Sequence, residues 1–378
     1  MTSRERLLAL LHGEPTDRIG LHLLGVRPWT PWWLKDRHPS YAPLIELARG
    51  QGDILSPIGF ETGFCCTAAP LHQTTFAEDV PGHGDVEHHV TIVEGPHGPL
   101  RQVVALHRIE RETMTVEHYV KTPDDAENVL AIPYVPVRPD MAPFVERDRA
   151  VGPRGLAMIG LGTDPIGLVH GLLGTERLAV WSVEHRDLIH AMLREFLRRL
   201  LDVVRQFAAS GLHRQMPLLF FHTGAEIVAP PIHGPADFHD FCTRYDTQLH
   251  AAIHEAGGRI RVHCHGRLGR ILEEFIAAGV DILQPVEPPP EGDVLLEDAK
   301  RRIGHDMVIE GNLQFSRLAT DPPHEFRCLV ERTVAAGKPG GRFILCPTAS
   351  PYWPQLPQLA LTNYRTMVNV ALSAGRYD

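Results

Sequence analysis

The chain has 378 residues, of which 43% are hydrophobic and 22% charged, as in globular proteins that build one large domain or two ordinary ones. Its net charge is −9 and it has no block of consecutive basic residues, which argues against a nucleic-acid partner. No stretch approaches the roughly 20 apolar residues needed to cross a bilayer, so no membrane partner is expected either.

The amino terminus, "MTSRERLLALLHG", has the pattern of a capped amphipathic helix that begins after Thr2 or Ser3. It lacks the long apolar segment of a signal peptide. The six cysteines are scattered, apart from the adjacent Cys65 and Cys66, and they show no disulfide framework. We therefore expect reduced thiols and a cytoplasmic location.

Two short apolar runs, at 18–24 and 52–57, predict the first two β-strands. After them, "HHVTIVEGPHGPLRQVVALHRIERETMTVEHYV" alternates polar and apolar residues around turn signals at Gly95 and Gly98. This is the periodicity of a β-hairpin. We therefore predict a β-rich insertion, with its return segment, over residues 61–150.

From about residue 150, short apolar runs alternate with amphipathic helical patterns, which indicates right-handed βαβ units in a parallel sheet. Six strands are predicted in this part of the chain, at 155–162, 217–224, 259–266, 281–288, 307–314 and 343–350. With the two earlier runs the count is eight, and no glycine-rich dinucleotide fingerprint is present. Both observations favour a single α/β domain over residues 1–378, a (β/α)8 TIM barrel with a β-hairpin insertion after its second strand.

Active sites of such barrels lie at the carboxyl ends of the strands. Chemically reactive or polar side chains occur at several predicted strand ends: Asp53, His222, Glu226, His263, His265, Glu287, Asn312 and Cys346. Carboxylate, imidazole and thiol groups that converge on one mouth predict a functional site there.

His263 and His265, in "RVHCHG", would point to the same side of a strand because side chains alternate. With Glu287 from the next strand they offer two nitrogens and one oxygen, which suits catalytic zinc and also resembles the ligand set of non-haem iron. Cys346, from the last strand, could add a thiolate. The alternatives are hydrogen-bonded core histidines, a loop carboxylate paired with arginine, and a buried thiol.

Other candidates would contact the substrate. Glu226 follows "FFHTGA" and would orient or deprotonate the substrate, while His222 is either a catalytic group or an inward core residue. Asn312, in "EGN", is either a substrate contact or a turn former. The segment "RPWTPWW" brings Arg27 and Trp29 near the mouth, where they would line a pocket or pack the amino-terminal segment.

Four segments, "HCHG", "ILEEFIAAGVDIL", "EDAKRRIG" and "IEGNLQ", follow one another as they do in the uroporphyrinogen decarboxylase superfamily, which this chain resembles. "LLALLHGEPTDRIGLHL" and "KTPDDAENV" extend the resemblance over nearly the whole chain. The resemblance implies a (β/α)8 barrel, as the strand count does.

The superfamily has branches with different chemistry. The true decarboxylases hold substrate carboxylates with an arginine-rich segment, whereas "LLGVRPWTPWW" supplies only Arg27 here, although Asp53 in "GDILSP" is similar to their aspartate. The zinc-dependent methyltransferases, and the more distant cobalamin-independent methionine synthases, carry a His-x-Cys pattern. His263 matches its first position and His265 stands where the cysteine would be. Glu287 is similar to the synthase glutamate, and Cys346 lies three residues before the position of the family's last cysteine.

The resemblance implies a metal-dependent methyltransferase that transfers or removes a methyl group of a small molecule. His263, His265 and Glu287 would hold the divalent ion, zinc or iron. No cobalamin-binding motif occurs in the chain, so any corrinoid would be carried by a separate protein, and a homodimer would be in keeping with the superfamily. One alternative is a lyase for a small carboxylated substrate, with Asp53 and the histidines protonating a carbanion. The other is a ligand-binding barrel without catalysis.

Overall fold

The computed structural model describes residues 1–109 and 112–377, and two residues of the expected hairpin region, Glu110 and Arg111, lie outside it. The chain divides into two compact units. The first comprises residues 1–60, 140–162 and 204–378, and the second comprises residues 61–139 and 163–203. The second unit thus shares residues 61–139 with the expected insertion at 61–150 and adds residues 163–203, whereas residues 140–150 belong to the first unit.

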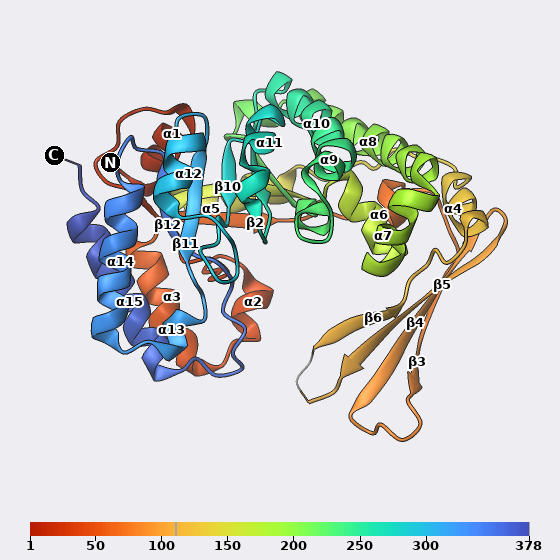
Figure 1. Cartoon of the computed structure of the whole chain (residues 1–378), viewed down its shortest axis with the longest axis horizontal. Helices are drawn as coiled ribbons and strands as arrows, with labels where there is room; N and C mark the ends of the chain where they lie inside the picture. Colours follow the sequence, from red (N-terminus) through yellow and green to blue (C-terminus); the bar gives the residue numbers. More distant parts are fainter. Residues whose placement is uncertain (110–111, 378) are drawn as a thin grey trace. The chain divides into compact units, whose positions relative to one another are not determined.

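The first unit is built on a curled, parallel, eight-stranded sheet, so the chain is an α/β protein with a TIM-barrel-like fold. In spatial order its strands are β1 (Gly20–Leu21), β12 (Phe343–Pro347), β11 (Val308–Leu313), β10 (Ile282–Gln284), β9 (Arg259–His263), β8 (Leu219–Thr223), β7 (Gly155–Thr163) and β2 (Ile54–Ile58). Each strand lies within or beside one of the predicted apolar runs (Figure 1).

The two edge strands of the sheet, β1 and β2, approach each other at Asp53. The backbone N–H of Asp53 donates to the carbonyl oxygen of Leu21 at 2.7 Å. On the other side of β1, Gly20 and Leu21 are in parallel register with Ile344 and Leu345 of β12. The sequential strand order and this backbone bond give the sheet the course of a barrel.

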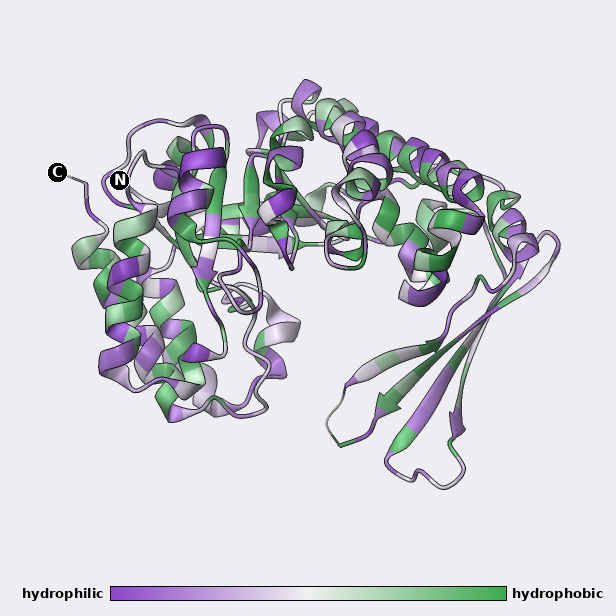
Figure 2. Cartoon of the chain, in the orientation of Figure 1, coloured by the Kyte–Doolittle hydropathy of each residue, from purple (hydrophilic) through white to green (hydrophobic). Residues whose placement is uncertain are grey.

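Helices alternate with the strands of the first unit. They are α1 (Ser3–His12), α2 (Pro31–Lys35), α3 (Ala42–Gln51), α5 (Ala142–Val151), α9 (Pro235–Phe238), α10 (Arg244–Glu255), α11 (Leu272–Ala277), α12 (Leu296–Ile303), α13 (Arg317–Thr320), α14 (Pro323–Gly337) and α15 (Gln358–Ala374). A π-helical turn, His239–Thr243, leads into α10. Apolar and polar residues mix along each helix in Figure 2, as expected for helices that cover a sheet on one face and meet water on the other.

The helix α1 lies against the apolar interior of the sheet. Thr2 caps it by accepting from the backbone N–H of Glu5, whose side chain accepts in return from the N–H of Thr2. Leucines of α1 pack with inward residues of the strands in one buried cluster: Leu7, Leu10, Leu11, Leu55, Leu156, Met158, Leu219, Ile282, Val308 and Ile344. Because several of these residues lie early in their strands, the cluster fills the amino-terminal end of the barrel.

The second unit contains an antiparallel sheet of four strands: β3 (Gln73–Asp79), β4 (Val86–Gly95), β5 (Gly98–His107) and β6 (Thr113–Glu117). The turn between β4 and β5 falls at Gly95 and Gly98, as the sequence pattern predicts. The unit also holds α4 (Pro123–Leu130), α6 (Pro165–Leu173), α7 (Thr175–Glu184) and residues 186–203 of α8 (Arg186–Ala209). Inside it the buried guanidinium of Arg199 donates to the carbonyl oxygens of Cys65 and Ile132.

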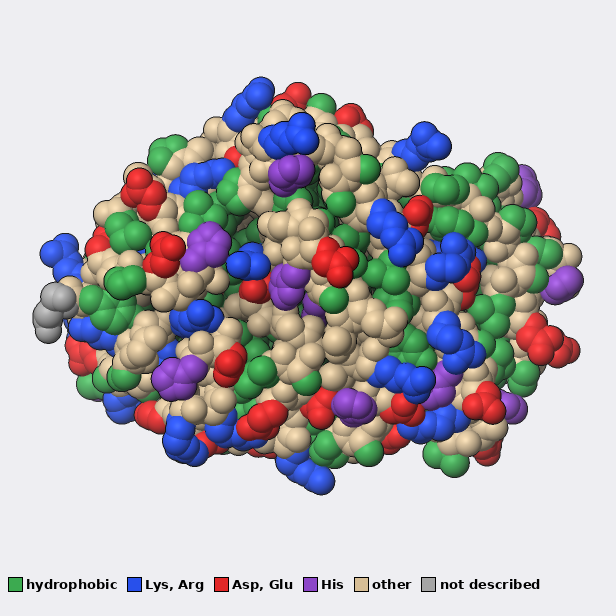
Figure 3. All heavy atoms as spheres, turned by 90° about the horizontal axis from the view of Figure 1, so that it is seen from above, with side chains coloured by type: hydrophobic (Ala, Val, Ile, Leu, Met, Phe, Trp, Pro, Cys, Tyr) green, Lys and Arg blue, Asp and Glu red, His purple; other side chains and the backbone are tan. Residues whose placement is uncertain are grey.

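Among the described residues, none of the helices has the length and apolar character required to cross a membrane. All six cysteines are free thiols. Acidic and basic side chains are interspersed over the face shown in Figure 3.

Candidate functional site

A cavity of about 350 Å³ lies within the first unit. It is lined by His22, Leu24, Gly25, Val26, Arg27, Leu55, Pro57, Met158, Phe221, Thr223, Arg261, His263, His265, Gln284, Ala349 and Ser350. Leu55 and Met158 reach the cavity from the core cluster below it, and most of the other lining residues come from the later parts of the strands and from the segments that follow them. The cavity therefore lies on the side of the sheet where barrel enzymes carry their active sites.

The rim of the cavity holds the two histidines of "HCHG". The Nδ1 of His263 lies 2.5 Å from the side-chain oxygen of Gln284, and the Nδ1 of His265 lies 3.0 Å from Oε2 of Glu287. The two imidazole rings meet edge to face, with 4.5 Å between their centroids. Gln284 also donates through its amide nitrogen to the carbonyl oxygen of Thr348 at 3.4 Å, which fixes its oxygen toward His263.

These contacts give the two imidazoles different protonation behaviour. Burial and the neighbouring His265 lower the pKa of His263 to about 4, so its ring is neutral at pH 7. Burial also disfavours the charged form of His265, but its hydrogen bond to Glu287 outweighs burial and raises the pKa of His265. Burial would raise the pKa of Glu287, yet the hydrogen bond from His265 lowers it overall. The rim therefore combines a neutral imidazole with an imidazole–carboxylate pair.

Glu226 lies close to this pair. It sits in the single turn Ala225–Val228 that follows β8, and its Oε2 accepts from the backbone N–H of Gly224 at 3.1 Å. Its negative charge also contributes to the raised pKa of His265. The structure thus brings Glu226 to the side of the rim where His265 and Glu287 lie.

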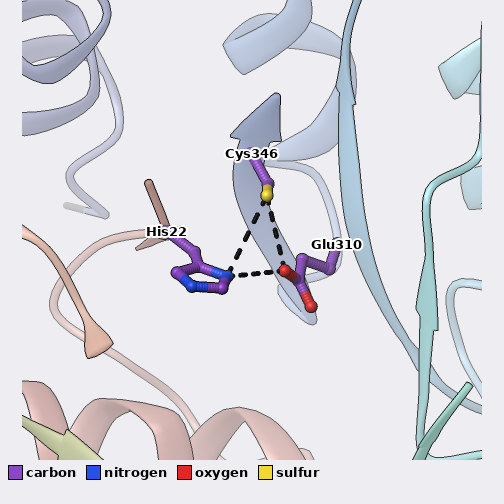
Figure 4. A group of neighbouring side chains, drawn as sticks. All are labelled: His22, Glu310 and Cys346. Carbon is purple, nitrogen blue, oxygen red and sulfur yellow. Dashed lines mark hydrogen bonds and ion pairs between the residues drawn. The ribbon is translucent and has the colours of Figure 1, made fainter. Parts of the chain in front are cut away.

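A buried polar cluster forms the floor of the cavity. Glu310 of β11 accepts from Arg261 at 2.6 and 3.1 Å and from Nδ1 of His22 at 2.7 Å, and the Cys346 thiol donates to it at 3.4 Å. Figure 4 shows His22, Glu310 and Cys346 pointing toward one another from three neighbouring segments of the chain. Arg261 stands two residues before His263 on the same strand face, one layer deeper in the barrel.

The floor is electrostatically balanced. Burial would raise the pKa of Glu310, but the charges of Arg261 and His22 lower it far below its ordinary value. Burial and the adjacent Glu310 carboxylate raise the pKa of the Cys346 thiol, which therefore stays protonated. The Glu310 carboxylate accepts from guanidinium, imidazole and thiol donors. Each donor in the floor therefore has an acceptor, and the negative charge of Glu310 lies beside the positive charge of Arg261.

Arg27 makes one wall of the cavity cationic. Its guanidinium lies 5.6 Å from the ring centroid of Trp32, and burial and the nearby Arg37 lower its pKa. Arg147 of α5 lies close enough to have its own pKa lowered by burial and by the charge of Arg27. Among the described residues no carboxylate forms an ion pair with Arg27, so this wall is suited to an anionic ligand group.

The predicted metal ligands are only partly brought together. His263 and His265 line the cavity, and Glu287 is bonded to His265. Among the described residues, three sets have donor atoms that all lie within 4.8 Å of one another: His22–Glu310–Cys346, His222–Asp246–His250 and Asp164–Cys242–Asp246. His263, His265 and Glu287 are not such a set. Cys346 lies in the floor with Glu310 rather than beside these three, which corrects its placement as their fourth ligand.

Asp53 is not at the mouth of the barrel. It precedes β2, at the amino-terminal end of the strand, and its carboxylate accepts from Arg6 at 2.6 Å, from Arg18 at 2.8 Å and from the N–H of Leu21 at 2.9 Å. This buried ion network joins α1 to the edge strands of the sheet. The expectation that Asp53 reaches the substrate is corrected, because its oxygens are engaged at the opposite end of the barrel.

His222 faces away from the cavity. In β8, Phe221 and Thr223 line the cavity, so the alternation of side chains turns His222 outward toward α10. There its Nε2 lies 2.8 Å from Nε2 of His250. The expectation of a catalytic or inward-facing His222 is therefore corrected.

Asn312 and Trp29, the other predicted substrate contacts, are not among the described residues that line the cavity. Asn312 is buried on β11 in register with Cys346, and Trp29 is half-buried before α2. Arg27 does line the cavity.

Sequence reasoning named Cys346 but missed the other members of the floor, His22, Arg261 and Glu310. Arg261 lies two positions before His263, so the alternation that made His263 a candidate also places Arg261 on the inner face. Glu310 is a charged residue inside the apolar run "MVIEGNLQ", and a buried charge in such a run needs a partner. Only the fold shows that Arg261 and His22 are that partner, because they lie far from Glu310 in the sequence.

Three comparisons relate the chain to known proteins. The sequence profile of the uroporphyrinogen decarboxylase (URO-D) family matches residues 103–371, and no curated protein matches the chain. A solved methyltransferase from Methanosarcina mazei superposes with a TM-score of 0.63 at 15% identity, covering 99% of this chain and 99% of that one. A 3-keto-D-glucoside 4-epimerase from E. coli gives a TM-score of 0.36 at 11% identity, covering 66% of this chain and 94% of that one.

The family profile spans well over half of the chain, and the structural likeness to the methyltransferase extends over its whole length. The order of motifs in the sequence, the TIM-barrel-like sheet and the polar mouth agree with that match. The chain belongs to the uroporphyrinogen decarboxylase family.

Proposed function

We propose that this enzyme of the uroporphyrinogen decarboxylase family transfers or removes a methyl group of a small molecule bound in the mouth cavity, with the help of a divalent metal ion. The observation that carries the proposal is the rim, where His263 at the end of β9 and His265 just after it stand beside a carboxylate that lies 3.0 Å from His265. The likeness in fold to a solved methyltransferase supports the same reaction class.

His263, His265 and Glu287 fit a metal ion by the chemistry of their donors, since two imidazoles and one carboxylate suit catalytic zinc, with iron as the alternative. The bond from His263 Nδ1 to Gln284 also has the form that orients a ligand histidine, because it leaves Nε2 with its lone pair. The three donor atoms are less tightly gathered than in the three sets within 4.8 Å, so the rim is not a ready-made coordination sphere. A bound ion would act as a Lewis acid on the methyl acceptor or on the group that loses its methyl.

The remaining residues would bind and orient the substrate. Arg27 would hold an anionic group, while the apolar wall, which includes Leu55, Met158 and Phe221, would exclude water. Glu226 would orient the substrate or accept its proton, and its place beside His265 supports this role. The His265–Glu287 pair would keep a proton at Nδ1 of His265.

The methyl carrier is also part of the proposal. A corrinoid group would be supplied by a separate protein, because the chain shows no cobalamin-binding motif. A homodimer is the assembly that we propose for the chain.

The test uses the purified full chain and a His263→Ala, His265→Ala double variant. We expect the metal content to fall by one ion per chain and methyl transfer from small methylated carboxylates to cobalamin or thiol acceptors to be lost. His254→Ala is the matched control, since His254 pairs with Asp281 at 2.8 Å away from the cavity, and it should keep both properties. An unchanged metal content in the double variant contradicts the ligand assignment.

A second candidate function is a lyase that acts on a small carboxylated substrate. Arg27 favours it, because an unpaired guanidinium in the cavity wall is suited to a carboxylate. The proton would come from the rim histidines, since Asp53 is engaged at the other end of the barrel. Release of CO₂ by chelator-treated protein, without methyl transfer, would favour the lyase over the methyltransferase.

A further inference from the structure

A second group of metal-type side chains lies outside the sheet, between β8 and α10. His222 and His250 are 0% exposed and Asp246 is 2% exposed. The Nε2 atoms of the two imidazoles are 2.8 Å apart, and Oδ2 of Asp246 lies 3.9 Å from Nε2 of His222. Asp246 and His250 are one turn apart on α10, so both side chains face the same strand.

The hydrogen bonds of the two histidines favour a cation between them. Nδ1 of His222 faces the carbonyl oxygen of Thr223 at 3.3 Å, and Nδ1 of His250 faces that of Ala278 at 2.8 Å. A carbonyl oxygen only accepts, so these contacts favour the tautomer with a proton on each Nδ1. In that tautomer the two neutral imidazoles have no further N–H, and their Nε2 lone pairs then point at each other across 2.8 Å. Either an additional proton or a metal ion removes this repulsion.

The carboxylate beside the pair indicates which of the two it is. The Cys242 thiol donates to Oδ2 of Asp246 at 3.4 Å, but Oδ1 of Asp246 is buried and has no hydrogen-bond partner within the described part of the chain. Such an oxygen is costly unless a cation or donor meets it. A proton shared between the two Nε2 atoms would leave this oxygen without a partner, whereas a metal ion held by all three side chains would meet it.

We infer that His222, His250 and Asp246 form a structural zinc site that fastens α10 to β8. Histidine ligands of zinc commonly donate their other ring N–H to a backbone carbonyl, as both do here. Two nitrogens each about 2.0–2.1 Å from a tetrahedral zinc are roughly 3.3 Å apart, so the pair opens by roughly half an ångström on binding.

This site is separate from the rim of the cavity. None of its three residues lines the cavity, and each is buried, as in closed sites that hold a metal for stability. The floor cluster His22–Glu310–Cys346 gathers donor atoms equally closely, but its hydrogen bonds are complete and include Arg261, so it needs no added cation. The inference does not depend on the proposed function.

The test starts from full-length His263→Ala, His265→Ala protein, in which the proposed rim ligands are gone. After chelation and dialysis this protein is reloaded with zinc alone, and the bound metal is measured by elemental analysis. We expect one ion per chain, and loss of that ion when His250→Gln or Asp246→Asn is added. His254→Gln, one turn further along α10, is the control that should keep it.

A second measurement applies even if the added substitutions prevent folding. In the starting double variant, zinc should raise the thermal midpoint and a chelator should return it to the metal-free value. The inference is overturned if this variant takes up no zinc, or if folded His250→Gln and Asp246→Asn proteins keep the ion. Loss of one ion through His250→Gln together with none through the rim substitutions would support this site and contradict the rim ligands.

Discussion

The molecule buries two clusters of imidazole, carboxylate and thiol groups, one inside the curled sheet and one between the sheet and α10. In the inner cluster Glu310 accepts from Arg261, His22 and Cys346, so every donor meets an acceptor. In the outer cluster His222 and His250 present Nε2 atoms to each other, and an oxygen of Asp246 has no donor among the described residues. The difference teaches that closeness of ligand-type residues does not by itself identify a metal site, and that the hydrogen-bond partners of each residue have to be considered as well.

The largest expected effect concerns the inner cluster. Glu310→Ala leaves Arg261 and His22 buried without their acceptor, and we expect a loss of about 3–5 kcal/mol in the free energy of unfolding. Denaturant titration measures this loss. The exposed pair of Glu273 and Arg302 provides the control, because Glu273→Ala should cost about 1 kcal/mol or less. A small loss for Glu310→Ala would mean that the floor is not a coupled network.

The second effect distinguishes the clusters by their response to metal. At a free zinc concentration about one hundred times the dissociation constant, an ion bound only to the folded state adds about 2.7 kcal/mol of stability. In the His263→Ala, His265→Ala background, which lacks the proposed rim ligands, we expect this increment to persist when Glu310→Gln is added and to be lost when His250→Gln is added. Thermal unfolding with and without chelator measures it. A loss of the increment in Glu310→Gln protein would place the ion in the floor instead.

The third effect is the acid dependence of stability. The charge of Arg261 and His22 lowers the folded-state pKa of Glu310 against the effect of burial, while in the unfolded chain the pKa of glutamate is about 4.3. Below about pH 4.3 the unfolded chain binds a proton that the folded chain does not, so stability falls by up to about 1.4 kcal/mol per pH unit. In Glu310→Gln protein we expect this part of the loss of stability at low pH to be absent.

Asp17 offers a comparison for that measurement. The hydrogen bond from Arg6 lowers the pKa of Asp17 to about 2, but Asp17 is partly exposed and its pairing is screened by solvent. Asp17→Asn should therefore reduce the loss of stability at low pH less than Glu310→Gln does. Equal effects of the two substitutions would contradict the special role of the buried floor.

The smallest effect concerns the wall of the cavity. Arg27→Met should weaken the binding of a carboxylate-bearing ligand roughly tenfold, because a charge-assisted hydrogen bond is lost, and should barely change stability. Calorimetric titration measures the affinity. Arg49→Met is the control, since Arg49 pairs with Glu46 on the surface. If the affinity is unchanged in Arg27→Met protein, Arg27 does not bind an anionic group of the ligand, and the proposal that the substrate carries such a group is contradicted.

Much of the fold could be predicted because buried parallel strands are short apolar runs, and each of the eight strands lies at one of them. Placement within a strand was less accurate. Asp53 precedes its strand rather than ending it, and this shift of a few residues moves its side chain from one end of the barrel to the other. His222 lies one residue from Phe221, and one residue reverses the face of the sheet.

The candidate site could be predicted only where it is local in sequence. His263 and His265 share one strand end, so alternation alone brings them to the cavity together. The partners of Glu310 and of His222 come from distant segments, and no periodicity within one segment indicates which of them will meet. Such pairs follow from tertiary packing, which a pattern in a single sequence does not encode locally.

The pairing of the first strand with the last has a consequence for synthesis of the protein. Gly20 and Leu21 find their backbone partners at Ile344 and Leu345, more than three hundred residues later. As the ribosome releases the chain, the leucine face of α1 must wait, without its final neighbours, until nearly all of the polypeptide has emerged. The barrel is therefore completed late, because the strands that close it are far apart in the sequence. Contacts of this kind slow folding and make assistance by chaperones useful.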